Sequence, residues 1–165
     1  MQRITGTRRI VPTRLPDGWA LREVRVDGID VTDRPLTFGR REQSLNDVEV
    51  VLTDRVGEIS GTLVDADGRV APGSFAVAMP MDRELRYPES RFLRRATPDA
   101  DGAFRIANLS PGAYYLAAVR AVLIDGEDAW QDAAFLESLT PLATAVTVKY
   151  GERATVVLNC AEGGR

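Results

Sequence analysis

The sequence contains no histidine, one cysteine and one lysine, and each shortage excludes a class of chemistry. Without histidine, a Ser-His-Asp triad, a histidine general base and a histidine-ligated zinc site are all excluded. The single cysteine, Cys160, cannot form an intrachain disulfide, and no nearby residue in the sequence would activate its thiol. We therefore interpret Cys160 as an unpaired structural thiol rather than a nucleophile.

The sequence also lacks a long apolar run and an excess of positive charge. Its longest apolar run, residues 114–124, is interrupted by Arg120 and falls short of the roughly 20 residues of a membrane-spanning helix. Lys and Arg total 21 against 24 Asp and Glu, so neither membrane insertion nor nucleic-acid binding is expected. Residues 1–15 lack the apolar segment of a signal peptide. We expect a cytoplasmic protein if the chain is complete, and a periplasmic or secreted one if it belongs to a longer protein.

The feature that is present throughout is a series of short β patterns. A chain of 165 residues, 44% of them hydrophobic, can build a core without disulfides or metals. Alternating apolar residues between Gly, Pro and Asp-Gly turns predict an all-β fold, an antiparallel Greek-key β-sandwich of about seven strands. One short helix is predicted near residues 132–139, with Asp132 as its N-cap.

The N-terminal third is less regular. Residues 1–18 are expected to form an irregular arm, and residues 19–55 a β-strand extension. The extension begins with a hairpin around Asp27-Gly28 and ends with a strand over 48–52 whose apolar residues share one face. We interpret it as the end of a truncated preceding repeat. Because its strands lack evident partners, we expect them to pack on the main domain or to form a homo-oligomer.

The most strongly patterned stretch runs from Asp101 to Val119. Asp101-Gly102 predicts a turn, and Pro111-Gly112 predicts a type II turn with a positive φ at the glycine. The segments on either side alternate at the period of a β-strand. We therefore predict a hairpin that places four large side chains in the core, namely Phe104, Ile106, Tyr114 and Leu116.

The same stretch, read as Asp-Gly-x-Phe-x-Ile-x-x-Leu-x-Pro-Gly-x-Tyr-x-Leu-x-Ala, resembles the hallmark of carboxypeptidase regulatory-like domains. Residues 59–73 resemble the opening hairpin of that family, with the order shifted to Val70-Ala71-Pro72-Gly73. The resemblance covers roughly residues 56–158. It implies a transthyretin-like (prealbumin-like) sandwich, related to starch-binding domains, over residues 56–160. Such modules are usually non-enzymatic parts of bacterial envelope or secreted proteins, so the resemblance implies no catalytic residue and no cofactor.

The tetrapeptide Asp-Ala-Asp-Gly occurs at 65–68 and again at 99–102. Paired aspartates supply the oxygen ligands that Ca²⁺ prefers, but the other ligands of an EF-hand loop are absent. Asp-Gly between two strands is also a common turn. We favour the turn interpretation and predict no metal site.

Two loops carry the candidate binding residues. Tyr87 lies in a charged loop over 81–90, close in sequence to Arg91, and Trp130 lies in a polar loop over 126–132. Aromatic rings beside polar groups can stack on a sugar or anchor a protein partner. The alternative for Trp130 is that it caps the sandwich beside Phe135 and Leu136.

The remaining charged clusters are interpreted as solvated surface. The acidic group lies in the second loop and comprises Asp125, Glu127 and Asp128. The arginine group follows the first loop and comprises Arg91, Arg94 and Arg95.

Three functional hypotheses remain open. The first is a non-catalytic structural or binding module, a spacer or interaction domain of a larger bacterial envelope or secreted protein whose partner is a polysaccharide or another protein domain. The second is a carbohydrate-binding module that uses Tyr87, Arg91 and Trp130. The third is a small carboxylate-dependent hydrolase, for which the sequence offers no specific pair of acids.

Overall fold

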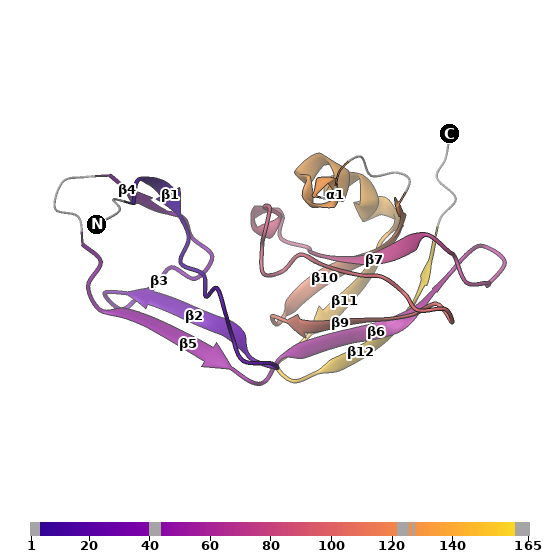
Figure 1. The fold of residues 1–165 in the computed structure, drawn as a ribbon, viewed down its shortest axis with the longest axis horizontal. Helices are drawn as coiled ribbons and strands as arrows, with labels where there is room; N and C mark the ends of the chain where they lie inside the picture. The colour runs from indigo at the N-terminus through magenta and orange to yellow at the C-terminus, as the bar shows by residue number, and fades with distance from the viewer. Residues whose placement is uncertain (1–3, 40–43, 122–125, 127, 161–165) are drawn as a thin grey trace. The chain divides into compact units, whose positions relative to one another are not determined.

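The computed structural model describes residues 4–39, 44–121, 126 and 128–160, and the chain divides into two compact units (Figure 1). The first unit is Met1–Arg55 and the second is Val56–Arg165. Each unit has its own strands and its own hydrophobic core, so the two are described in turn.

The first unit contains a two-stranded sheet that the sequence did not predict. Strand β1 (Gly6–Arg8) pairs antiparallel with β4 (Leu36–Phe38). The expectation of an irregular arm over residues 1–18 is therefore wrong for residues 6–8. Their pattern is too short to show alternation, and their partner lies far along the chain.

The second sheet of this unit has the order β3-β2-β5. Its strands are β2 (Ala20–Val26), β3 (Ile29–Asp30) and β5 (Val48–Thr53). The predicted hairpin is confirmed, because β2 and β3 pair antiparallel across Asp27 and Gly28, which have φ angles of 50° and 75°. Two positive φ angles are what a tight two-residue hairpin turn requires.

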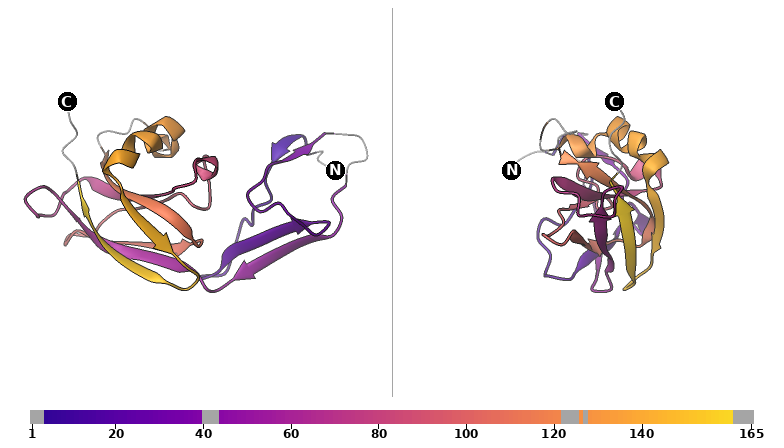
Figure 2. Two further views of the ribbon diagram at one scale, coloured as in Figure 1. Left: turned by 180° about the vertical axis from the view of Figure 1, so that it is seen from behind. Right: turned by 90° about the vertical axis from the view of Figure 1, so that its right-hand side faces the viewer.

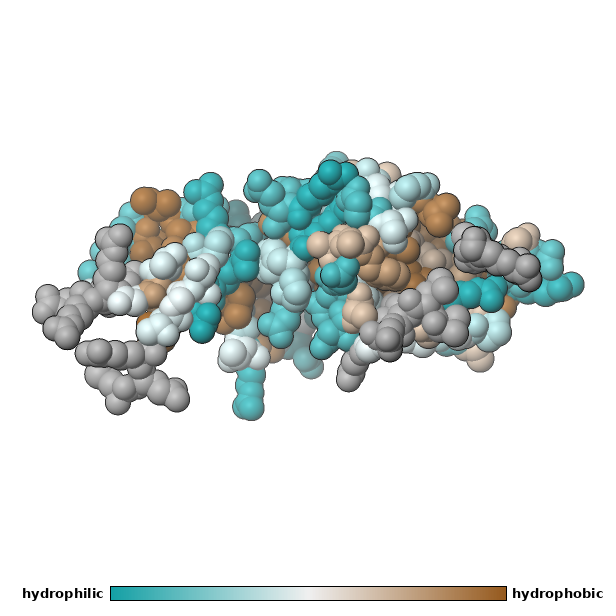
Figure 3. All heavy atoms as spheres, turned by 90° about the horizontal axis from the view of Figure 1, so that it is seen from above, coloured by the Kyte–Doolittle hydropathy of each residue, from teal (hydrophilic) through white to brown (hydrophobic). Residues whose placement is uncertain are grey.

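The core of the first unit is small. It consists of four buried side chains, Leu21, Val24, Val26 and Val31. Leu52 packs against this core, whereas Val48 and Val50 are 42% and 45% exposed. The predicted strand is present, but the core reaches only its second half, so the apolar residues of its first half are exposed. Hydrophobic surface on the first unit is visible in Figure 3.

The second unit is a β-sandwich of the predicted number of strands, with a three-stranded and a four-stranded sheet. The smaller sheet has the order β12-β6-β9 and the larger has the order β11-β10-β7-β8. The strands are β6 (Gly57–Val64), β7 (Ser74–Pro80), β8 (Arg94–Ala96), β9 (Ala103–Leu109), β10 (Gly112–Arg120), β11 (Thr144–Val148) and β12 (Arg153–Asn159).

The stretch 101–119 forms two strands, as predicted, but they are not a hairpin. Strand β9 pairs with β6, whereas β10 pairs with β7 and β11, so the short connection at Ser110-Pro111 crosses from one sheet to the other. Gly112 does not have a positive φ; it is already the first residue of β10. The positive φ lies earlier, at Asn108 (57°). The predicted type II turn is therefore wrong, although the four predicted core side chains are buried.

The last two strands also separate. We predicted β11 and β12 around a turn at residues 150–152, and both exist, but β11 joins β10 while β12 joins β6. The β6–β12 pair is parallel, from Glu58 opposite Arg153 to Val64 opposite Asn159. The expectation of an entirely antiparallel sandwich is wrong for this pair.

Two apolar clusters cover the two faces of the larger sheet. The backbones of the two sheets are drawn in Figures 1 and 2. The cluster between the sheets includes Ile59, Leu63, Phe104, Ile106, Tyr114 and Leu116. The cluster on the other face includes Phe75, Val77, Met79, Leu93, Trp130 and Leu136. Because both faces are covered, every residue of β7 is buried.

Helix α1 (Ala133–Leu139) covers the outer face of the larger sheet. Its predicted N-cap is confirmed, because Asp132 Oδ1 accepts hydrogen bonds from the backbone N–H groups of Ala134 and Phe135, both at 3.0 Å. Leu136 points into the second cluster and is fully buried. The helix thereby carries Glu137 to the loop that follows β7.

Candidate functional site

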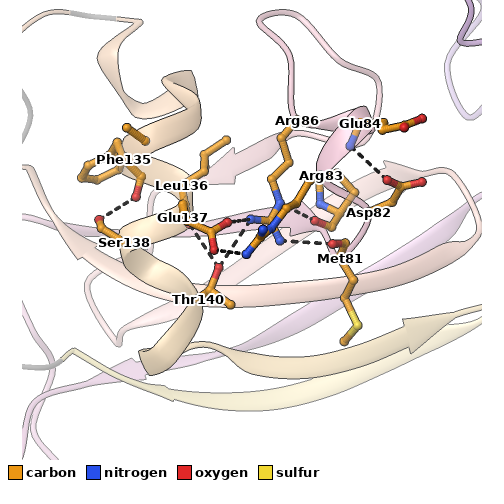
Figure 4. A network of polar contacts seen from close by, with 12 residues as sticks. Met81, Asp82, Arg83, Glu84, Arg86, Phe135, Leu136, Glu137, Ser138 and Thr140 are labelled. Carbon is orange, nitrogen blue, oxygen red and sulfur yellow. Dashed lines mark hydrogen bonds and ion pairs between the residues drawn. The ribbon is translucent and has the colours of Figure 1, made fainter.

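The loop that follows β7 is a folded structure rather than a solvated chain (Figure 4). It begins with a short 3₁₀ helix, η1 (Arg83–Leu85), capped by Asp82, whose Oδ1 accepts the N–H of Glu84 at 2.9 Å. The loop then turns back toward the sheet at Arg86. This arrangement fixes the position of Tyr87, the first predicted binding residue.

Arg86 is the centre of the loop. Its side chain is only 4% exposed, and its guanidinium donates to the Pro80 carbonyl oxygen at 2.8 Å and to that of Met81 at 3.3 Å. It also donates to Glu137 Oε2 at 2.9 Å, and it lies 5.8 Å from the centroid of the Tyr115 ring. A buried guanidinium needs such partners, because an unpaired charge in the interior is costly.

Glu137 joins the loop to helix α1. Its second oxygen, Oε1, accepts a hydrogen bond from Arg83, a residue whose side chain is 76% exposed. One carboxylate therefore holds one buried and one exposed arginine (Figure 4). A further bond joins the loop to η3 (Ala129–Gln131), since the backbone N–H of Glu89 donates to Gln131 Oε1 at 2.6 Å. The two loops that we predicted to carry function thus meet.

Tyr87, in the first loop, and Arg91, just after it, are both half-buried. Arg91 donates from Nη1 to Ser110 Oγ at 3.1 Å and lies over the Phe92 ring at 4.6 Å. The loop is closed between them by the bond from the Ser90 N–H to the Tyr87 carbonyl oxygen at 3.0 Å. Both side chains are therefore held on a fixed backbone and remain partly accessible.

Trp130 is placed differently from the first expectation. Its residue is only 8% exposed, because the indole belongs to the apolar cluster under α1. The Arg95 guanidinium lies 5.6 Å from the ring centroid. The premise that Trp130 is an exposed aromatic is wrong, and the alternative interpretation, in which it caps the sandwich with Phe135 and Leu136, is confirmed.

The arginine group after the first loop is not uniformly solvated. Arg94 donates to the Leu93 carbonyl oxygen at 2.8 Å and to that of Ser90 at 3.3 Å. Its burial lowers the pKa of the guanidinium below the ordinary value, and the nearby charge of Arg91 adds to this effect. The solvated-face interpretation is wrong for Arg94, whereas Arg95 is exposed.

The two Asp-Ala-Asp-Gly segments are the same turn built twice. Asp65 Oδ1 accepts the N–H groups of Asp67 and Arg69, each at 2.9 Å. Asp99 Oδ1 accepts those of Asp101 and Ala103 at 3.0 and 2.9 Å. The turn interpretation is confirmed, since the first aspartate of each copy bonds its own backbone. Among the residues that the structure describes, no group of three or more acidic or cysteine side chains could hold a metal ion.

The structure also locates the cysteine and part of the acidic group that were discussed from the sequence. Cys160 is a free, buried thiol, and its Sγ lies 3.3 Å from Ser74 Oγ. In the acidic group, Asp125 and Glu127 lie outside the described residues, whereas Asp128 Oδ1 accepts a bond from Gln131 at 3.3 Å. Within the described part of the chain, no helix is long and apolar enough to cross a bilayer.

No local pattern in the sequence indicates the Arg86–Glu137 pair. The two residues lie 51 positions apart, and the loop around Arg86 has charged residues that stay exposed. Only the folded topology shows which arginine of the loop lies beneath α1. Asp132 is the sequence signal that could have narrowed the set of helix residues that contact the loop. As the N-cap, it fixes where α1 begins and therefore which residues of α1 face the loop.

No family model matches the chain, and no curated protein matches it. Among solved structures, the chain is similar to a candidate carbohydrate-binding protein of Pseudomonas aeruginosa, at 17% identity and a TM-score of 0.38, over 63% of this chain and 88% of that one. It is also similar to the minor pilin of Streptococcus agalactiae, at 17% identity and a TM-score of 0.39, over 89% of this chain and 61% of that one. The major pilin subunit of Bacillus cereus matches at 14% identity and a TM-score of 0.39, over 74% and 35%. The chain thus spans less than two thirds of the length of either pilin.

Proposed function

We propose that the chain is a non-catalytic structural module, a β-sandwich spacer or interaction domain of a larger bacterial envelope or secreted protein. The observation that carries this proposal is the tandem arrangement of two units, each with a core of its own. Only residues 54–56 separate β5 from β6, so the second unit follows the first almost directly. Successive small domains with short connections suit a spacer, because each adds length to the chain without requiring a partner to fold.

The polar groups of the second unit support the same proposal. The buried arginine of the first loop is occupied by two carbonyl groups and Glu137, and the repeated aspartates are occupied by their own turns. These contacts order the surface loops. They suit a module whose task is to keep its shape, whereas a catalytic group needs polar atoms that are directed at a substrate.

The two tryptophans provide the test, because Trp19 lies in the first unit and Trp130 in the second. In urea, the fluorescence of Trp130 in the Trp19→Phe variant reports the unfolding of the second unit. The fluorescence of Trp19 in the Trp130→Phe variant reports the unfolding of the first unit. We expect two cooperative transitions with different midpoints, the second unit being the more stable because its core is larger. A single coincident transition in both variants would show one cooperative body and contradict the proposal.

We further propose that the second unit is a carboxypeptidase regulatory-like domain of an exported protein. The residues of the hallmark support it, since Phe104, Ile106, Tyr114 and Leu116 all lie in the core. The Tyr114 hydroxyl donates to the Ser110 carbonyl oxygen at 2.5 Å, so the tyrosine of the pattern fastens the connection between the sheets. Fractionation of the source bacterium with an antibody to this chain tests the export, and recovery in the cytoplasm alone would contradict it.

Carbohydrate binding is the second candidate, and the fixed loop of Tyr87 and Arg91 favours it. A half-exposed aromatic ring and a nearby guanidinium on a rigid backbone can bind a sugar with little loss of conformational entropy. Glycan-array binding should then be lost in Tyr87→Ala and Arg91→Ala and kept in Arg83→Ala, whose side chain is exposed on the same loop. Binding that is unaffected by the first two substitutions, or no binding to any glycan, would count against this candidate.

A further inference from the structure

The first and last strands of the second unit are paired with each other in parallel. Strand β6 begins the unit and β12 is its final described strand, and their register runs from Glu58 opposite Arg153 to Val64 opposite Asn159. The ladder is closed at both ends. The N–H of Glu58 donates to the Glu152 carbonyl oxygen at 2.9 Å, and the N–H of Cys160 donates to the Val64 carbonyl oxygen at 2.7 Å.

This pairing determines how tension along the chain would load the unit. Tension enters at the start of β6 and leaves at the end of β12, which are opposite ends of the same ladder. Because the strands are parallel, the force slides one along the other and loads all the ladder hydrogen bonds together. Strands that are pulled from the same end instead separate one bond at a time.

Side-chain contacts tie β6 and β12 to the core and to their neighbouring strands. Ala154, Val156 and Leu158 of β12 pack on the core between the sheets. Glu58 accepts hydrogen bonds from Arg105 on β9, and Arg153 of β12 lies 4.0 Å from the other oxygen of Glu58. One carboxylate on the middle strand therefore contacts an arginine on each neighbouring strand.

The two strands also approach closely at Gly61. A Cβ atom at this position would overlap the carbonyl oxygen of Val156 on β12. Since Gly61 does not need a positive φ, its role is to admit the neighbouring backbone. The absence of a side chain lets the ladder close in the middle as well as at its ends.

We propose that the second unit is a load-bearing module whose β6–β12 ladder is the element that resists tension along the chain. This proposal rests on the proposed spacer function and adds a mechanical role to it. It predicts that resistance depends on the direction of pulling, because only the direction from one chain end to the other loads the ladder in shear.

Single-molecule pulling on the full chain tests the dependence on direction. Both proteins carry Cys160→Ser, which leaves no native thiol, and a handle at the N-terminus. In one, the second handle is at the C-terminus; in the other it is attached at Tyr150→Cys, in the turn before β12. The second geometry pulls β6 and β12 from the same end, since Glu58 lies opposite Arg153.

We expect the second unit to unfold at a severalfold higher force in the first geometry, because forced unfolding follows the barrier that the load must cross. Unfolding of the first unit gives an event common to both proteins. Equal forces in the two geometries would overturn the load-bearing proposal. That result would leave the two separate tryptophan transitions, and so the spacer proposal, intact.

A matched pair of glycine variants shows whether this ladder is the resisting element. Gly61→Ala places a methyl group against the β12 backbone, whereas Gly112→Ala meets only the Tyr114 ring at 3.6 Å. Under constant force between the chain ends, we expect Gly61→Ala to unfold about tenfold faster and Gly112→Ala to unfold like the parent. Similar rates for all three proteins would place the resistance elsewhere and overturn the assignment. If Gly61→Ala does not fold, the comparison of the two pulling geometries still tests the load-bearing proposal.

Discussion

Arg83 and Arg86 bind the same carboxylate from opposite environments, and the difference between them determines what each contributes to stability. Arg83 is largely in water, where an ion pair contributes little. Arg86 is buried, and its guanidinium satisfies two backbone carbonyl groups as well as Glu137. Removing Arg86 would leave these acceptors without a donor in the interior, which costs more than losing the ion pair alone.

We therefore expect Arg86→Met to lower the free energy of unfolding of the second unit by about 2–4 kcal/mol. Arg83→Met is the matched control, with an expected change of about 0.5 kcal/mol or less. Urea unfolding followed by Trp130 fluorescence, in a Trp19→Phe background, measures both. An equal effect of the two substitutions would contradict the role assigned to the buried guanidinium.

Acid should destabilise the two units through different carboxylates. The hydrogen bond from Arg105 lowers the pKa of Glu58 below its ordinary value, with Arg153 contributing, while burial opposes the shift. Because the folded-state pKa is below the unfolded one, this stabilisation is fully present above about pH 4.3 and is lost as the pH falls through the folded-state value. In the first unit, hydrogen bonds from the Thr32 hydroxyl and N–H lower the pKa of Asp30 in the same way.

We expect Glu58→Gln to flatten the acid dependence of the second unit, at a loss of about 1 kcal/mol at pH 7. The signal of the first unit should not change. Asp30→Asn is the counterpart and should affect only the first unit. Urea unfolding at several pH values between 2 and 7, read through Trp19 or Trp130, separates the two. A change in the same unit for both substitutions would show that the assignment is wrong.

Residue burial could be predicted where it follows from strand alternation. Phe104, Ile106, Tyr114 and Leu116 were predicted in the core and lie there. Trp130 was harder, because a polar loop sequence gives no periodicity, and its burial depends on the sheet face that η3 covers. The burial of Arg86 was not predicted, since it depends on a helix that lies far along the chain.

At the level of elements, the positions of the strands of the second unit could be predicted from local sequence, but their pairing partners could not. The period of two predicts one strand before Pro111-Gly112 and another after it, and both are present as β9 and β10. A tight connection usually indicates a hairpin, yet these strands belong to different sheets. Pairing depends on which face each strand must bury, and both faces of the larger sheet are covered by other elements.

The edge strand β5 leads to a prediction about association. Val48 and Val50 are exposed on it, and β2 is the strand that pairs with it in the described part of the first unit. An apolar edge strand is a template for pairing with another chain, so we propose that the chain forms homo-oligomers through β5.

Sedimentation velocity should then show a concentration-dependent oligomer that Val50→Lys converts to a monomer. Val11→Lys is the control, because Val11 is 62% exposed but lies outside the strands. Hydrogen exchange adds a second readout, in which the amides of β5 become protected as the concentration rises. A monomer at all concentrations, with β5 unprotected, would exclude association through this edge.

At the scale of the whole molecule, the chain consists of two compact units of unequal size. The first has a core of four buried side chains, whereas the second has apolar clusters on both faces of its larger sheet. The number of strands and the sandwich class could be predicted from turn spacing. The parallel β6–β12 pair could not, because it joins segments at the two ends of the unit and leaves no local pattern in the sequence.

The parallel pair also has a consequence for how the protein is made. Among the described strands of the second unit, β6 leaves the ribosome first and its partner β12 leaves last, so one edge of β6 stays unpaired until β12 has been translated. Contacts between segments that are distant in the sequence form slowly, and strand edges that remain unpaired during this time promote aggregation. The second unit should therefore need the whole of its sequence, through Cys160, before its smaller sheet can close. The last residues of the unit would then limit its yield during synthesis as well as completing its structure.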